Sequence, residues 1–162
     1  DVLGSRGLGD VYKRQMMNRR AQELMANGTH FMNPHGLHDD NHYTTAYDLY
    51  LIFNECIKHE DFVNIIQSEA YTAYYTDVDG NSQEALFTPT NLYAQGEVDV
   101  PENVTIVGGK TGTTDEAGYC LILMEKDSSD NPYISIVMGA SEKPVLYEDM
   151  TSLIEAIPSG QQ

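Results

Sequence analysis

The spacing of apolar residues predicts three helices in the first 67 residues of the chain. A helical period runs through 16–27, and Gly28 follows it as a C-cap. A second amphipathic stretch covers 45–57 and begins with a Thr-x-x-Asp capping box. A shorter helical piece, 60–67, would turn its apolar residues toward the core. The apolar positions of the three helices are Met17, Ala21, Leu24, Met25, Leu49, Ile52, Phe53, Cys56, Ile57, Phe62, Val63, Ile65 and Ile66.

Residues typical of strands begin near position 70. Two segments, 70–78 and 82–88, flank the sequence Asp-Gly-Asn at 79–81, which is typical of a hairpin turn. The hairpin tyrosines are Tyr71, Tyr74 and Tyr75. They would suit a sugar-stacking surface, but we favour ordinary strand packing.

The second half of the chain reads as a sheet followed by a helix. After a short irregular or 3₁₀ piece at 89–93, three apolar strand patterns cover 104–111, 118–126 and 133–140, and their spacing favours antiparallel neighbours. A closing amphipathic helix covers 145–157. Its apolar positions are Leu146, Met150, Leu153, Ile154 and Ile157. Helices, then strands, then a helix predict an α+β domain with an antiparallel sheet covered by helices.

Charge and cysteine content narrow the classes of function. The chain has 162 residues and a formal net charge of −16, which repels phosphate backbones and excludes nucleic acid as a partner. No apolar run is long enough to span a bilayer, and no basic segment followed by an apolar one marks a secretory signal. Cys56 and Cys120 are neither a disulfide framework nor a zinc site, and we expect two buried free thiols.

The most informative motif is Lys110-Thr111-Gly112, which ends an apolar strand pattern and precedes Thr113. A lysine at a sheet edge offers a positive charge, the adjacent threonine offers a hydroxyl, and glycine lets a ligand backbone approach. Such an edge would hold an extended peptide that ends in a carboxylate, by adding it as a further strand.

A cluster of histidines suggests a metal site as an alternative chemistry. His30, His35, His38 and His42 lie in a loop-like segment together with Asp39 and Asp40. The segment contains no His-Glu-x-x-His motif and no pair of histidines on a helix, so we favour hydrogen-bonded loop residues that brace the region of the motif. No metal or other cofactor is predicted.

Three blocks of the chain, 27–37, 43–49 and 108–120, follow one another in an order that a known family shares. The last block contains the Lys-Thr-Gly motif, which is the third motif of penicillin-binding proteins and serine β-lactamases. Together the blocks resemble the segment from just after the second motif to the third in the serine D-alanyl-D-alanine carboxypeptidases of the penicillin-binding protein family. The resemblance implies part of a β-lactamase/transpeptidase-like fold, with its N-terminal part missing.

The resemblance implies roles for four residues. Lys110 would help to position the proton network of the active site and attract the terminal carboxylate of the substrate. Thr111 would hydrogen-bond that carboxylate, and Gly112 would allow close approach. The backbone N–H of Thr113 would be one of two donors to the oxyanion.

The chain departs from the family pattern at the other two motifs. No serine has a lysine three residues later, so the nucleophile of Ser-x-x-Lys is absent from these residues, and we expect the chain alone to be inactive. Ser129-Asp130-Asn131 fits Ser-x-Asn formally, but it follows Lys-Thr-Gly in a polar segment, and we interpret it as a turn. The family's own Ser-x-Asn would stand shortly before Met16.

The first residues resemble a sequence of artificial origin. Residues 5–15 match one reading frame of a transposase adapter used in sequencing-library preparation. We therefore interpret 1–15 as an adapter artefact, with a disordered leader as the alternative. The catalytic-domain part would then occupy 16–158, followed by a tail at 159–162. A continuous upstream reading frame that includes the adapter-like residues would contradict this interpretation.

The resemblance also implies the setting of the parent enzyme. It would remove the terminal D-alanine from peptidoglycan stem peptides through an acyl-enzyme, bind β-lactam antibiotics, need no cofactor, and be exported to the cell envelope. The alternatives are a serine β-lactamase or a non-catalytic peptidoglycan-binding module. Because the upstream part would supply neighbouring strands, we expect the isolated chain to expose apolar faces and to dissolve poorly.

Overall fold

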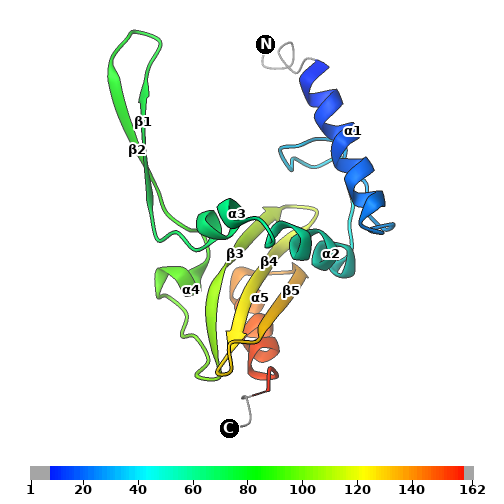
Figure 1. Cartoon of the computed structure of the whole chain (residues 1–162), viewed down its shortest axis with the longest axis vertical. Helices are drawn as coiled ribbons and strands as arrows, with labels where there is room; N and C mark the ends of the chain where they lie inside the picture. The colour runs from blue at the N-terminus through cyan, green and yellow to red at the C-terminus, as the bar shows by residue number, and fades with distance from the viewer. Residues whose placement is uncertain (1–7, 159–162) are drawn as a thin grey trace.

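The computed structural model describes residues 8–158 (Figure 1). The helices are α1 (Leu8–Glu23), α2 (Ala46–Cys56), α3 (Glu60–Ile66), α4 (Leu92–Gln95) and α5 (Lys143–Glu155). The strands are β1 (Tyr71–Thr76), β2 (Ser82–Phe87), β3 (Val104–Thr114), β4 (Gly118–Asp127) and β5 (Pro132–Ala140). The predicted tail at 159–162 and the first seven residues of the predicted leader lie outside the described residues.

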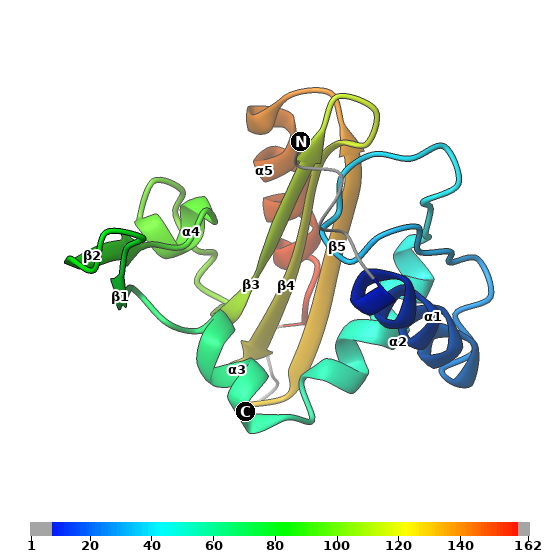
Figure 2. The ribbon, with the colours of Figure 1, turned by 90° about the horizontal axis from the view of Figure 1, so that it is seen from above.

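A three-stranded antiparallel sheet of order β3-β4-β5 forms the centre of the fold. On β4, Leu121 and Leu123 are buried and belong to one hydrophobic cluster with Met150 and Ile154 of α5. Figures 1 and 2 place α5 on this face of the sheet and α2 and α3 on the other. The predicted α+β fold with a helix-covered antiparallel sheet is confirmed.

Two glycines let β3 lie close to its neighbours. A Cβ at Gly108 would stand 2.2 Å from the carbonyl oxygen of Ile66 in α3, and a Cβ at Gly109 would stand 2.2 Å from that of Ile122 in β4. Any other residue at these positions would push α3 or β4 away. The glycines therefore hold β3 close to α3 and β4 directly before the Lys-Thr-Gly motif.

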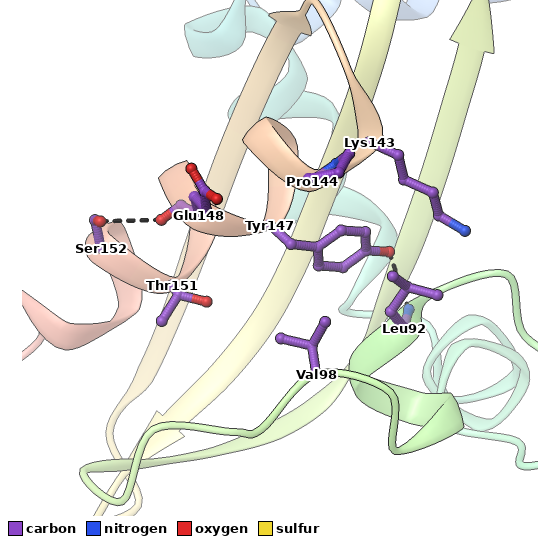
Figure 3. Close-up of a pocket in the computed structure, with 8 residues that line it drawn as sticks. All are labelled: Leu92, Val98, Lys143, Pro144, Tyr147, Glu148, Thr151 and Ser152. Carbon is purple, nitrogen blue, oxygen red and sulfur yellow. Dashed lines mark hydrogen bonds between the residues drawn. The ribbon is translucent and has the colours of Figure 1, made fainter.

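Helix α5 is tied to α4 by aromatic side chains (Figure 3). The Tyr147 hydroxyl accepts a 2.9 Å hydrogen bond from the backbone N–H of Leu92, and the Tyr93 hydroxyl lies 2.7 Å from that of Thr151. The two tyrosine rings pack edge to face, 5.4 Å apart. The apolar stripe predicted for this helix is buried, except that Leu153 is exposed, and the prediction for that residue was wrong.

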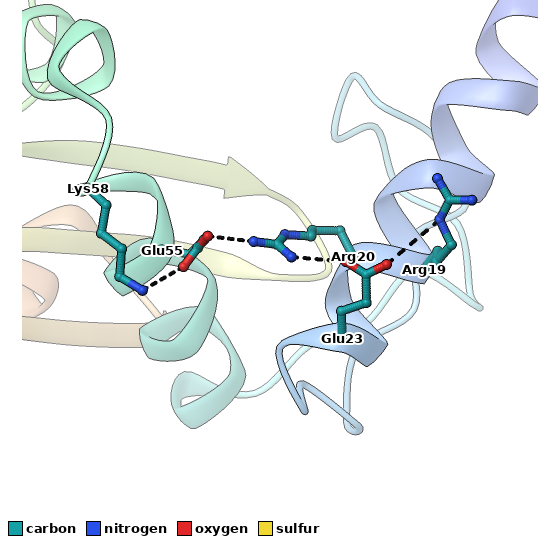
Figure 4. A network of polar contacts seen from close by, with 5 residues as sticks. All are labelled: Arg19, Arg20, Glu23, Glu55 and Lys58. Carbon is teal, nitrogen blue, oxygen red and sulfur yellow. Dashed lines mark hydrogen bonds and ion pairs between the residues drawn. The ribbon is translucent and has the colours of Figure 1, made fainter.

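Helix α1 begins at Leu8, eight residues before the predicted start at Met16, so the adapter-like residues 8–15 continue the helix. It rests on the body through buried Ala21 and through paired hydrogen bonds between the Asn18 amide and the backbone of Phe31. A chain of ion pairs also links it to α2 (Figure 4). The members of this chain are Arg19, Arg20, Glu23, Glu55 and Lys58.

The start of α2 follows the predicted capping box in part. The Thr45 hydroxyl accepts a hydrogen bond from the backbone N–H of Asp48, as predicted. The Asp48 carboxylate, however, is buried and accepts a 2.7 Å hydrogen bond from the Thr29 hydroxyl. Asp48 thus anchors the long loop that precedes α2.

The β1–β2 hairpin projects away from the sheet (Figure 1). Its turn is closed by the Asp77 carboxylate, which accepts hydrogen bonds from the backbone N–H groups of Asp79 and Asn81, and by Gly80 with φ +85°. The predicted strand packing of its tyrosines was wrong, because all three are exposed. The exposed fractions are 67% for Tyr71, 78% for Tyr74 and 53% for Tyr75.

Two further burial predictions were wrong in degree. Both free cysteines, Cys56 and Cys120, are half-buried and not buried, and partial burial raises the pKa of the Cys56 thiol. On α3, Ile65 is exposed while Ile66 is half-buried. Within residues 8–158 no helix is long and apolar enough to cross a membrane.

Candidate active-site edge

The Lys-Thr-Gly motif lies on the outer edge of the sheet. Within the described residues β3 pairs only with β4, so alternate backbone groups of β3 point to an open edge. Thr111 pairs with Leu121 and therefore faces α5, whereas Lys110 pairs with Ile122 and faces the side of α3. The lysine and the threonine thus reach the same edge from opposite faces of the sheet.

The motif leaves room for a ligand. Lys110, Gly112 and Thr113 are exposed, and Thr111 is half-buried. A Cβ at Gly112 would meet no atom within 4 Å, in contrast to the crowding at Gly108. The Lys110 ammonium donates a hydrogen bond to the carbonyl of Thr111. An anion that approaches this edge meets one positive charge and one hydroxyl, and the space beside Gly112 is open to it.

Thr90, which was not selected from the sequence, contacts the motif. The hydroxyl of Thr90 lies 2.5 Å from that of Thr111, although 21 positions separate them. This contact fixes the orientation of the Thr111 hydroxyl, which is the group predicted to meet a carboxylate. Because Thr90 stands in an irregular segment before α4, no periodic pattern marks it.

A cavity of about 710 Å³ opens beside the motif. Lys110 and Thr111 line it on the β3 side, and its other walls come from α3, the base of the hairpin and the segment before α4. The apolar wall residues include Ile65, Tyr71, Phe87 and Pro89. These side chains belong to three separate elements, so the sequence alone did not bring them together.

The histidine loop lies against the turn that follows the motif. His38 Nδ1 stands 3.7 Å from the Glu116 carboxylate between β3 and β4, and His38 Nε2 stands 3.2 Å from Asp40. His30 Nδ1 contacts the carbonyl of Asn41 at 2.7 Å. The loop is therefore hydrogen-bonded and contacts the β3–β4 turn, as predicted.

The remaining loop histidines also have local partners. His35 and His42 accept hydrogen bonds from the backbone N–H groups of Leu37 and Met32. Burial lowers the pKa of His42. Among residues 8–158, no group of three histidine, cysteine, aspartate or glutamate side chains is arranged to hold a metal ion.

The Ser129-Asp130-Asn131 segment forms the turn between β4 and β5. The Asp127 carboxylate accepts hydrogen bonds from the backbone N–H groups of Ser129 and Asn131, and Asp130 has φ +66°. The side-chain amide of Asn131 donates a further 2.8 Å hydrogen bond to this carboxylate and is the main reason that the pKa of Asp127 lies below its usual value. The predicted structural role of this segment is confirmed.

One ionisable group lies in the core, away from the motif. Glu125 on β4 is fully buried on the face that α5 covers, and neither carboxylate oxygen has a hydrogen-bond partner among the described residues. Burial raises the pKa of Glu125 to about 7, and the nearby Ser135 opposes this shift. The sequence pattern did not indicate that Glu125 is buried, because this residue stands in a charged Glu-Lys-Asp segment at the end of an apolar run.

Solved structures define the class of this fold. The chain superposes on the S216A mutant of the Streptomyces K15 DD-transpeptidase with a TM-score of 0.77 at 25% identity, over 88% of this chain and 52% of that one. It also superposes on an evolved putative penicillin-binding protein homolog from Mycobacterium tuberculosis with a TM-score of 0.68 at 22% identity, over 94% of this chain and 58% of that one. The fold is therefore part of the DD-peptidase fold.

Sequence relatives give the family. The model of the D-alanyl-D-alanine carboxypeptidase family matches residues 14–142, and the chain belongs to this family. It is 30% identical to D-alanyl-D-alanine carboxypeptidase DacF of Bacillus subtilis over 86% of this chain and 33% of the relative. It is also 30% identical to DacA of Haemophilus influenzae over 77% of this chain and 28% of the relative. The chain thus spans about a third of the length of the curated relatives it matches.

Proposed function

We propose that this chain forms the carboxylate-binding half of the active site of a serine D-alanyl-D-alanine carboxypeptidase. The observation that carries the proposal is the open edge of β3, where Lys110 and Thr111 meet beside unoccupied space at Gly112. Lys110 attracts the terminal carboxylate of the substrate, and the Thr111 hydroxyl donates a hydrogen bond to it. The peptide lies along the edge as an added strand.

The chemical step needs groups beyond these. The backbone N–H of Thr113 is proposed as one donor to the oxyanion that forms when the scissile carbonyl is attacked. The attacking serine belongs to a Ser-x-x-Lys motif, which does not occur in these 162 residues. We therefore propose that the chain alone does not hydrolyse peptides. The full-length gene product, meaning the longest reading frame that contains the chain, acts in the cell envelope on peptidoglycan stem peptides and is acylated by β-lactams.

Labelling with a fluorescent penicillin tests this proposal. We expect covalent labelling of the full-length gene product and none of the 162-residue chain. Stable labelling together with release of D-alanine from a D-alanyl-D-alanine peptide supports a carboxypeptidase. Rapid turnover of penicillin would indicate a β-lactamase instead, and absence of labelling in both proteins would indicate a peptidoglycan-binding module.

Two variants connect the labelling to the motif. Thr111→Val removes the hydroxyl that meets the carboxylate, and we expect the second-order rate constant of labelling to fall about 10- to 100-fold, the usual cost of a hydrogen bond to a charged group. Ser129→Ala is the matched control, because Ser129 stands in the β4–β5 turn and its backbone N–H is retained. An unchanged rate in Thr111→Val would contradict the proposed contact.

A further inference from the structure

The cavity beside the Lys-Thr-Gly motif combines two kinds of lining group. Lys110 and Thr111 supply a charge and a hydroxyl, and the largest of the remaining side chains are apolar. The lining also includes the smaller polar residues Ser68, Thr88, Thr90 and Asn91. Ile65, Tyr71 and Phe87 are largely exposed to solvent, with exposed fractions of 72%, 67% and 59%. Apolar side chains that stay exposed around a cavity favour a ligand that covers them. The matching ligand carries a carboxylate next to an apolar group.

The order of groups along β3 decides which part of a substrate meets this cavity, if the proposed function holds. The carboxylate would lie at Thr111 and the scissile carbonyl at the N–H of Thr113, two residues or about 7 Å further along the strand. This separation suits one amino-acid residue between scissile carbonyl and terminal carboxylate. That residue is the one released by hydrolysis, and it lies at the Lys110 end of the motif.

The cavity lies at that same end. Its β3 lining consists of Gly109, Lys110 and Thr111 and does not include Gly112 or Thr113. The acyl part of the substrate continues past Thr113 in the opposite direction. The cavity is therefore adjacent to the leaving residue and not to the acyl part.

We propose that this cavity binds the side chain of the released C-terminal residue, and that the enzyme accepts bulky apolar D-residues there. The methyl group of D-alanine fills only a small part of about 710 Å³. The side chain of D-leucine or D-methionine would reach Phe87 and Ile65 and remove their apolar surface from water. This proposal rests on the proposed function and deepens it, because it names the substrate class of the same site.

Peptide hydrolysis by the full-length gene product tests the proposal. Two acyl tripeptides that differ only in the last residue, D-alanine or D-leucine, are compared by kcat/KM. We expect the ratio of D-leucine to D-alanine to exceed one, by on the order of 10-fold, since a few methylene groups in an apolar pocket are worth that much. A ratio of one or less overturns the proposal.

Two neighbouring variants on β2 distinguish a contact in the cavity from a general effect of truncating an exposed side chain. Phe87→Ala removes part of the cavity wall, and we expect it to lower the D-leucine to D-alanine ratio about 10-fold. Leu86→Ala is the control, because Leu86 is similarly exposed (67%, against 59% for Phe87) on the same strand but does not line the cavity. A ratio that Phe87→Ala leaves unchanged, or that both variants lower equally, overturns the proposal.

The same experiment distinguishes failure of the inference from failure of the proposed function. Release of D-alanine with no preference for D-leucine retains the carboxypeptidase and removes only the apolar pocket. Absence of any release, together with absence of penicillin labelling, removes both. Because Phe87 is exposed, its truncation leaves folding intact, and penicillin labelling of the variant confirms that its active site is assembled.

Discussion

The central sheet and the β1–β2 hairpin are built from similar strand-forming residues but use them in opposite ways. On β4, alternate side chains from Leu121 to Asp127 are buried, and the sheet packs on α5. On β1 and β2 no side chain is buried, and Tyr74 and Leu86 stand in solvent. The hairpin is two-stranded, and such ribbons are marginal on their own. Strand-forming sequence therefore supplies stability in one region and an exposed apolar surface in the other.

The position of the candidate site follows from this difference. The sheet provides a fixed edge, since β3 is held by β4 on one side and by the close approach of Gly108 to α3 on its face. The base of the hairpin provides adaptable apolar side chains beside that edge. A rigid strand that positions charge, next to an exposed apolar wall, suits recognition of a ligand with both kinds of group.

Truncation of the core should have the largest effect on stability. Leu123→Ala removes a fully buried side chain between the sheet and α5, and we expect a loss of about 3 kcal/mol in the free energy of unfolding. Urea unfolding of the full-length gene product, followed by circular dichroism, measures the change. A loss below about 0.5 kcal/mol, the usual range of surface substitutions, would contradict the packing described for this face.

The buried carboxyl makes the same region sensitive to pH. Below its ordinary pKa of 4.5, Glu125 is protonated in both the folded and the unfolded state. As the pH rises from 4.5 toward 7, the unfolded chain releases its proton first, so the folded state loses stability, and the loss is complete above pH 7. The separation of the two pKa values corresponds to about 3 kcal/mol.

Glu125→Gln should remove this dependence. We expect the variant to gain stability relative to the original protein at pH 8 and to differ little at pH 4, as measured by urea unfolding at both values. Glutamine has nearly the same shape as glutamate, so the packing is kept. The cost of burying a charge disappears, because glutamine is neutral at every pH. An equal change at both pH values would show that Glu125 is not the titrating group.

A pair of glycines compares packing with ligand access on one strand. Gly108→Ala places a methyl group against the backbone of α3, and we expect a loss of about 1 to 3 kcal/mol in the free energy of unfolding. Gly112→Ala meets open space, so stability should hardly change, whereas penicillin labelling should become slower because the methyl group occupies the approach of the ligand. Equal effects of the two substitutions on both properties would contradict the assignment of the open edge.

The periodicity of the sequence predicted the helices and strands better than it predicted which of their side chains are buried. The helix and strand patterns around the central sheet were confirmed, and so was the structural turn at Ser129-Asp130-Asn131, because alternation and turn chemistry are local properties. The start of α1 at Leu8 was missed, because residues 5–15 contain two glycines and show no sustained helical period. Exposure of the hairpin tyrosines was also missed, because it depends on whether anything packs against the hairpin.

The candidate site shows the same limit. Lys110 and Thr111 were selected from their sequence motif, and the structure places them at a sheet edge. Thr90, however, reaches Thr111 only through the tertiary fold, and the apolar cavity wall is assembled from α3, the hairpin and the segment after it. A sequence pattern records neighbours along one element, and these contacts join several.

The smallest expected effect tests the hairpin itself. Tyr74 is 78% exposed on β1 and does not line the cavity, so Tyr74→Ser should change the free energy of unfolding by less than about 0.5 kcal/mol. The preference for D-leucine over D-alanine should also stay the same, because Phe87 and Tyr71 remain in place. A loss comparable with that of Leu123→Ala would mean that another part of the full-length gene product packs on the tyrosines. The hairpin would then be a stabilising interface, and the contrast between the two regions would no longer hold.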